Sequence, residues 1–141
     1  MEECIKAEIF HCNLDVKGIA KIKVEGNCMA PIIKHGDYVI VQKRDYHDYQ
    51  VGDIVICGIY KLVAHRIVKK VYQSENVQYI TKGDNENALD PIRNQSAIKG
   101  KIMYAYNDEI HYQNIYGTKV ENLLIAKLSY QSFILSSSLQ Y

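Results

Sequence analysis

The stretch VEGNCMAPIIKHGD, residues 24–37, joins two segments that have the composition of β-strands. A run rich in Ile and Val reaches Gly26, and Cys28 follows two residues later. Glycine allows unusual backbone dihedrals, and Pro31 fixes its own φ angle. The pattern therefore predicts a thiol displayed at a strand end, where a substrate carbonyl could reach it. The alternative is a small buried hydrophobic residue beside a tight turn, as free cysteines often are.

Composition limits the classes of protein to consider. The chain has 141 residues, the size of one ordinary domain, and such a domain needs no disulfide or metal to fold. Its 48% hydrophobic and 23% charged residues are typical of a globular protein, and its 12 tyrosines favour strands. A net charge of +1 gives no basic footprint for nucleic acid, so we expect no nucleic-acid partner.

The N-terminal residues and the cysteines bear on location. The acidic start at Met1–Glu3 and the absence of an apolar h-region indicate no signal peptide, and no window resembles a membrane span. Four cysteines without an export signal predict free thiols in a reducing compartment, and we expect a cytoplasmic protein. The spacing of Cys4 and Cys12 does not match a zinc site, so the sequence predicts neither a metal nor a cofactor.

Alternating apolar segments predict a mainly β fold, closed or nearly closed like a small barrel to hide its edges. Residues 3–12 are interpreted as a short first strand or an extended arm, followed by a turn at 13–18. Further strands are expected at residues 19–24, 38–41, 54–57, 61–72, 77–81, 98–106 and 110–116. Two Gly-Asp pairs, at 36–37 and 52–53, each precede a strand and form a weak internal echo.

The C-terminal segment has a different pattern. Residues 119–141 carry apolar residues at helical spacings, which predicts an amphipathic helix attached to a β-rich domain of residues 1–118. Packing of this helix on the barrel is favoured. Contact with a membrane surface is less favoured because the polar face lacks the Lys and Arg enrichment of such helices.

A reactive thiol usually needs an imidazole or another positive charge beside it. Of the five histidines, His65 stands out because it lies centrally in an apolar strand. A carboxylate from the Asx-rich loop, Asp84 or Asp90, could orient its ring. The alternatives are a partly buried structural histidine and, especially for Asp84, simple stabilisation of a turn.

Several boxes in this chain resemble those of the S24/S26 peptidases, which include type I signal peptidases and self-cleaving SOS repressors. The run GNCMAP at 26–31 with Gly36-Asp37 is similar to the family's G-x-S-M-x-P…G-D box, and VGDIV at 51–55 to its second Gly-Asp strand start. The run AHRIV at 64–68 resembles the H-R box of the endoplasmic-reticulum type, found also in archaea and Gram-positive bacteria. The runs TKGDN at 81–85, with Asp90, and IKGKI at 98–102 complete a set in the family's order within residues 24–102.

This resemblance implies a mostly β fold around a nucleophile–His pair assisted by Asp. By position, Cys28 stands where the family has Ser, His65 is the general base and Asp90 the acid. Residues near the substrate or oxyanion would be Gly26, Met29 and Pro31, and structural support would come from Arg66, Gly83 and Asp84.

The function implied is an endopeptidase without a cofactor that cleaves an extended leader or precursor peptide. Membrane-bound signal peptidases carry a hydrophobic anchor before the nucleophile, and the resemblance extends better to small members without one. The alternative is a family member that binds a peptide or protein partner without cutting it. Self-cleavage is less favoured because little chain precedes residue 24. The sequence predicts no particular oligomeric state.

Overall fold

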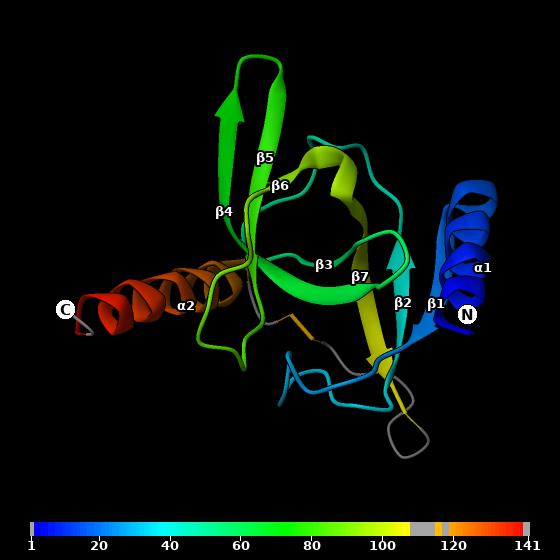
Figure 1. Ribbon diagram of the computed structural model, residues 1–141, viewed down its shortest axis with the longest axis horizontal. Coiled ribbons are helices and arrows are strands. Elements are labelled where there is room, and N and C mark those ends of the chain that lie inside the picture. The colour runs from blue at the N-terminus through cyan, green and yellow to red at the C-terminus, as the bar shows by residue number, and fades with distance from the viewer. Residues whose placement is uncertain (1, 108–114, 117–118, 140–141) are drawn as a thin grey trace.

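A computed structural model describes residues 2–107, 115–116 and 119–139 of the chain. One antiparallel sheet forms the body of the protein, and a helix near each end of the chain flanks it (Figure 1). This arrangement confirms the mainly β class with a C-terminal helix. The elements in order are α1 (Glu2–Lys17), β1 (Ile19–Lys23), β2 (Tyr38–Gln42), β3 (Ile54–Cys57), β4 (Val63–Gln73), β5 (Asn76–Lys82), β6 (Arg93–Asn94), the 3₁₀ turn η1 (Gln95–Ala97), β7 (Ile98–Tyr106) and α2 (Lys119–Leu139).

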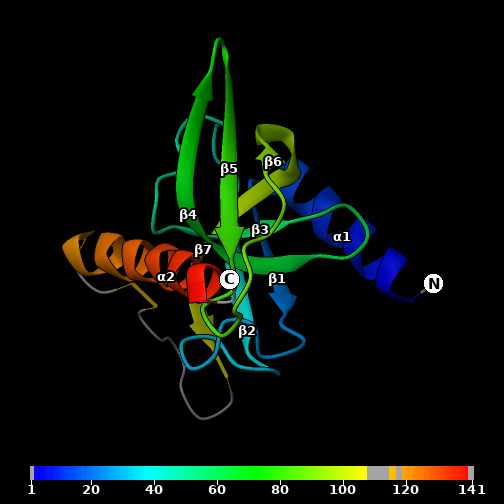
Figure 2. The same ribbon diagram turned by 60° about the vertical axis from the view of Figure 1, so that its left-hand side comes forward.

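The seven strands form a single sheet in the order β1-β2-β7-β3-β4-β5-β6. The sheet is strongly curled into a half-barrel, and the β4–β5 hairpin projects beyond it (Figure 2). Curling brings the chain around β4 near the loop that follows β1, although these elements are far apart in the sheet order. The near-closed, barrel-like prediction is therefore confirmed.

Strand β3 is buried along its whole length because one hydrophobic cluster packs on each face of the strand. Side chains alternate across a strand. Ile54 and Ile56 accordingly join the cluster that contains Phe10 and Met29, whereas Val55 and Cys57 join the cluster around Tyr79. The candidate site lies at the margin of the first cluster, against which Cys28 packs.

The prediction of a first strand or extended arm at residues 3–12, with a turn at 13–18, is wrong: helix α1 covers this segment. Ala7, Phe10 and Leu14 have helical spacing and are all buried against the sheet. Gly18, with φ of 74°, ends the helix, and its N–H donates to the Leu14 carbonyl over 2.9 Å. Burial of one helical face outweighs the loose alternation that suggested a strand.

The strand expected at 110–116 falls largely outside the described residues. Of its last two residues, Tyr116 lies against the sheet without being part of a strand. Its hydroxyl donates to the Ile102 carbonyl over 2.6 Å and accepts the Ile54 N–H over 3.0 Å. This side chain therefore bridges β7 and the beginning of β3.

Helix α2 lies against β4, and polar contacts join its described side chains to the sheet. Asn122 accepts a hydrogen bond from Arg66 over 3.3 Å, and Ser129 accepts one from Lys82 over 2.9 Å. Ala126 is buried between them.

Four large apolar side chains in the described part of α2 are exposed. Leu123, Leu124, Ile125 and Leu128 are 41%, 53%, 36% and 55% exposed. Contacts at Asn122 and Ser129 join this part of the helix to the sheet, and the expected packing of the whole segment 119–141 stays a prediction. Within residues 2–107, 115–116 and 119–139, no helix is both long and apolar enough to cross a bilayer.

The ion pair between Arg66 and Asp84 generates a stability prediction. Arg66 is fully buried, and its Nη2 lies 2.8 Å from Asp84 Oδ2. Asp84→Asn leaves the buried guanidinium without its counter-charge, so we expect the free energy of unfolding to fall by about 3–5 kcal/mol. Chemical denaturation measures this loss. Asp15→Asn, which removes the exposed pair with Lys43, is the control and should leave the unfolding midpoint nearly unchanged. Equal midpoints for both variants would contradict the prediction.

Candidate active site

The segment that carries Cys28 is a loop between β1 and β2, closed at its base by backbone hydrogen bonds. The Val24 N–H donates to the Asp37 carbonyl over 2.8 Å, and the Gly36 N–H donates to the Val24 carbonyl over 2.9 Å. Gly26 has φ of 81°, a conformation that side-chain-bearing residues rarely adopt. These constraints fix where Cys28 lies relative to the sheet.

The two Gly-Asp pairs seen in the sequence form the same local structure. Asp37 Oδ2 accepts the Lys34 N–H, and Asp53 Oδ2 accepts the Gln50 N–H, each over 2.9 Å. Both preceding glycines have positive φ. The first turn leads into β2 and the second lies just before β3. The similarity of the two Gly-Asp sequences therefore corresponds to a repeated turn.

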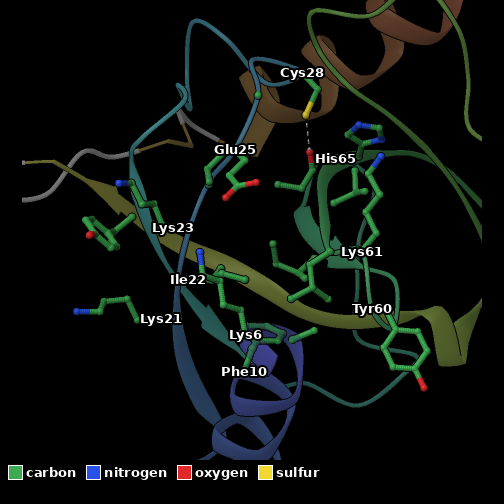
Figure 3. Close-up of a pocket in the computed structure, with 18 of the residues that line it drawn as sticks. Lys6, Phe10, Lys21, Ile22, Lys23, Glu25, Cys28, Tyr60, Lys61 and His65 are labelled. Carbon is green, nitrogen blue, oxygen red and sulfur yellow. Dashed lines mark hydrogen bonds between the residues drawn. The ribbon is translucent and has the colours of Figure 1, made fainter. Parts of the chain in front are cut away.

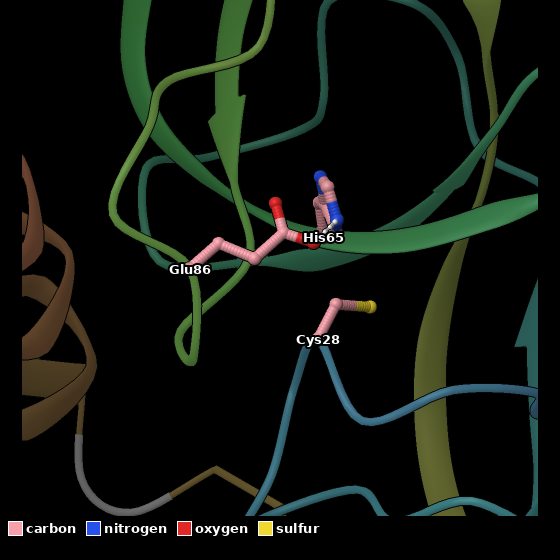
Figure 4. Close-up of side chains that lie close together, drawn as sticks. All are labelled: Cys28, His65 and Glu86. Atoms are coloured by element: carbon pink, nitrogen blue, oxygen red, sulfur yellow. Dashed lines mark ion pairs between the residues drawn. The ribbon is translucent and has the colours of Figure 1, made fainter.

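Cys28 and His65 lie together although 36 residues separate them in the chain. The Cys28 sulfur, a ring nitrogen of His65 and a carboxylate oxygen of Glu86 all lie within 4.8 Å of one another (Figure 4). Cys28 comes from the β1–β2 loop, His65 from β4 and Glu86 from the loop after β5. In this arrangement the thiol donates to the Ala64 carbonyl over 3.4 Å. Catalytic hydrogen bonds are often loose before substrate binds, so this contact is compatible with a Cys–His pair.

Asp90 lies behind the imidazole ring. Its Oδ2 is 2.5 Å from His65 Nδ1 and accepts a hydrogen bond from the Thr81 hydroxyl over 2.6 Å. Arg93 Nη2 approaches the same oxygen at 3.5 Å. A carboxylate in this position holds the proton on Nδ1, so Nε2 is the ring nitrogen left for Cys28 and Glu86.

These contacts determine the charges in the site. Burial lowers the pKa of His65, but interactions with Asp90 and Cys28 outweigh it and raise the pKa to about 9. Burial raises the pKa of Asp90, whereas hydrogen bonds from His65 and Thr81 lower it further, so the net shift is downward. An imidazolium paired with a carboxylate therefore stands beside Cys28 at neutral pH. By contrast, burial raises the pKa of Cys57 to about 12, which keeps that thiol protonated.

The loop of residues 83–90, here called the aspartate loop, also contacts the backbone that carries the thiol. The Asn85 N–H donates to the Cys28 carbonyl over 2.8 Å, and the Asn85 side chain donates to the Asn27 carbonyl over 3.1 Å. A Cβ at Gly83 would lie 2.8 Å from the Cys28 carbonyl oxygen, closer than real contacts allow. Gly83 thus permits the close approach, and Asp84 supports the same loop through Arg66.

The other expected site residues lie elsewhere around the loop. Gly26 lines the pocket, and its N–H donates to His35 Nδ1 over 2.9 Å. The Met29 side chain is buried in the hydrophobic cluster, where its sulfur accepts the Asp84 N–H over 3.4 Å. Pro31 is exposed, and neither Met29 nor Pro31 lines the pocket.

Three residues of the site escaped the sequence reasoning: Thr81, Glu86 and Arg93. Thr81 stands in the TKGDN run and Glu86 in the Asx-rich loop, but neither was assigned a role. No sequence pattern indicates a role for Arg93, because its contact with Asp90 is visible only in the folded structure.

Cys28 and His65 lie at one end of a pocket of about 900 Å³ (Figure 3). Its lining extends from the thiol along residues 21–25 to Phe10 and Lys6 of α1, with residues 60–64 opposite. The lining is apolar over much of its surface and carries lysines as well. Such a pocket can hold several residues of an extended chain with its backbone passing Cys28.

Together, these observations define a β-rich half-barrel in which a thiol lies near an imidazole ring that a carboxylate holds in place. The family model described as Peptidase S24-like matches residues 12–103, well over half of the chain. The chain belongs to this family of peptidase-like proteins.

Curated relatives extend this comparison. The chain is 35% identical over 74 residues to the signal peptidase complex catalytic subunit SEC11 of Candida albicans strain WO-1, which covers 50% of this chain and 43% of the relative. It is 33% identical over 75 residues to SEC11 of Debaryomyces hansenii, covering 50% and 44%. With SEC11 of Metarhizium acridum it shares 30% identity over 73 residues, covering 49% and 42%. The matches thus span less than half the length of these relatives, and no solved structure matches the chain.

The raised pKa of His65 can be tested by titration. We expect its ring resonances to titrate near pH 9 in the wild-type protein and at lower pH in Asp90→Asn, since the neutral amide cannot stabilise the imidazolium by charge. NMR titration measures both values. The exposed variant Asp45→Asn is the control. An unchanged His65 pKa in Asp90→Asn would contradict the electrostatic account.

The same shift predicts how folding stability depends on pH. Because folding raises the His65 pKa above its ordinary value of 6.5, its contribution to stability is complete below about pH 6.5 and is lost as pH rises through about 9. The wild-type unfolding free energy should therefore decline across this window more steeply than that of His65→Gln. Urea denaturation at each pH measures these free energies. Equal slopes with pH for wild type and His65→Gln would contradict the prediction.

Proposed function

We propose that this protein is an endopeptidase that cleaves an extended peptide, with Cys28 as nucleophile, His65 as general base and Asp90 as the group that orients the ring. The observation that carries the proposal is the convergence of thiol, imidazole and carboxylate at one end of a peptide-sized pocket. Membership of a peptidase family supports it.

The reaction follows from the positions of these groups. With a proton on His65 Nε2, the Cys28 sulfur attacks the scissile carbonyl as the thiolate beside this imidazolium and forms a tetrahedral intermediate. The imidazolium then gives this proton to the departing amine, and a thioester remains on Cys28. Water, deprotonated by His65, attacks the thioester, releases the acid product and restores the thiol. Throughout, the Asp90 carboxylate stabilises the charged ring.

The oxyanion that forms on the carbonyl needs a hydrogen-bond donor. Within the described residues, the Cys28 backbone N–H donates to no carbonyl, so it is free to serve as that donor. The Gly26 N–H is already directed to His35, and glycine offers no hydroxyl of its own. One such donor contributes about 2.7–4 kcal/mol to transition-state stabilisation in comparable enzymes.

The substrate we propose is an extended segment of a leader or precursor peptide. Strand β1 is at the edge of the sheet, and residues 21–25 line the pocket next to Cys28. A peptide could add there as a further strand, with main-chain hydrogen bonds giving affinity and side-chain contacts giving specificity. The relatives named as signal peptidase subunits support a precursor peptide as substrate. A cytoplasmic location stays a prediction.

Cleavage of internally quenched peptides with small residues at the cleavage site tests the proposal. Cys28→Ala and His65→Ala should each lower kcat/KM by about 10³-fold or more, because each removes a member of a unit that acts together. Cys12→Ala removes an exposed thiol of α1 and should leave turnover unchanged. Mass spectrometry of the products locates the cleaved bond.

Equal turnover by wild type, Cys28→Ala and His65→Ala would refute the peptidase assignment. Peptide binding without cleavage, measured by fluorescence anisotropy, would support the alternative of a family member that holds its partner intact. Circular dichroism of each variant confirms that the fold is retained.

A further inference from the structure

We propose that Cys28, His65 and Glu86 form a zinc-binding site whose occupation blocks the nucleophile. Metal binding by these three residues does not depend on the peptidase activity proposed above; only its inhibitory consequence rests on that function. No local spacing of residues indicates this metal site, because the three ligands come from three separate elements. Their juxtaposition appears only in the folded chain (Figure 4).

The distances between the ligand atoms are close to those of a zinc site. Zinc binds thiolate at about 2.3 Å, imidazole at about 2.0–2.1 Å and carboxylate at about 2.0–2.2 Å, so ligands of a tetrahedral site lie roughly 3.3–3.6 Å apart. His65 Nε2 and Glu86 Oε1 are already 3.5 Å apart. The Cys28 sulfur lies within 4.8 Å of both partners, so a small side-chain rotation completes the geometry.

An independent observation is the support of His65 from behind. Histidines that bind metals commonly donate their other ring N–H to a carboxylate, which fixes the ring and makes the ligand nitrogen more basic. Here Asp90 occupies that position at Nδ1, and Thr81 and Arg93 hold Asp90 in turn. Nε2 therefore faces the space between Cys28 and Glu86, where zinc would bind it in place of its proton.

The donor set selects the type of ion. Thiolate and imidazole suit zinc, whereas magnesium and calcium prefer oxygen ligands. Three protein ligands leave a fourth position, which the pocket can supply with water. All three residues line that pocket, and the Glu86 side chain is 42% exposed, so an ion can enter from solvent and the carboxylate can adjust.

Zinc bound here would occupy the sulfur that attacks the substrate and the nitrogen that accepts its proton. Both groups would be unavailable for acyl transfer, so zinc would act as a reversible inhibitor. Removal of the ion by a chelator would restore the thiol without any redox step.

Two measurements test the site on the intact chain. Titration calorimetry with Zn²⁺ should give one ion per chain, and Co²⁺ should produce the charge-transfer absorption of a cobalt–thiolate bond. Glu86→Gln should weaken Zn²⁺ binding by about 10-fold or more, since loss of a ligand costs at least as much as loss of an outer-shell partner. Cys28→Ala should abolish the cobalt–thiolate absorption. Glu75→Gln, an exposed carboxylate on the β4–β5 hairpin, is the matched control.

Binding that survives both Glu86→Gln and Cys28→Ala would overturn the proposal, as would binding lost in Cys12→Ala, which would place the ion on α1. Circular dichroism excludes unfolding as the cause of lost binding. In the peptidase assay, zinc should lower turnover and a chelator should restore it; activation by zinc would overturn the inhibitory role. A wild-type protein that binds zinc through these residues but cleaves no peptide would support the metal site and refute the peptidase assignment alone.

Discussion

The attachment of the aspartate loop to β4 is the constraint on which the site depends. Adjacent residues of β4, His65 and Arg66, each pair with an aspartate of this loop: Asp90 at one end and Asp84 near the other. Neighbouring side chains on a strand face opposite sides of the sheet. The His65–Asp90 pair therefore lies on the side of Cys28, while the Arg66–Asp84 pair anchors the loop toward α2 and the turn at Gly52.

These pairs explain why ionisable groups can be buried in so small a domain. Arg66 is fully buried and His65 nearly so, and an unpaired charge at either place would be very costly. Each has a carboxylate partner, and Arg66 also donates to the Gly52 carbonyl over 3.0 Å. The hydrogen bonds from Asn85 to the carbonyls of Asn27 and Cys28 fix the position of the thiol relative to this loop. The same framework that holds the sheet together thus brings the thiol, the imidazole and the carboxylate to one place.

Much of this arrangement was predictable because it is recorded in local patterns. Glycine, proline and aspartate mark the turns around Cys28, and alternating Ile and Val mark the strands. The order of the boxes pointed to His65 and Asp90, which the structure brings together with Cys28. Other features depend on tertiary contacts that no local pattern contains. The helix α1 is an intermediate case, since the spacing of Ala7, Phe10 and Leu14 was visible but its charged residues obscured it.

Glu86 and Arg93 show the limit of sequence reasoning most clearly. Both belong to polar stretches in which any residue could face solvent, and their approach to His65 and Asp90 follows only from the path of the aspartate loop. Met29 shows the converse: its place beside the nucleophile suggested contact with substrate, but its side chain points into the core. The exposed leucines of α2 likewise could not be separated from core residues by spacing alone.

The proposed peptidase mechanism requires that Cys28 reacts with a peptide carbonyl under the control of His65. Its most direct test is an acid quench of the protein during peptide turnover, followed by digestion and mass spectrometry of the Cys28 fragment. We expect a thioester-linked acyl group on Cys28 in the wild-type protein and none in His65→Ala. Turnover without an acyl group on Cys28, or an acyl group on another residue, would contradict it.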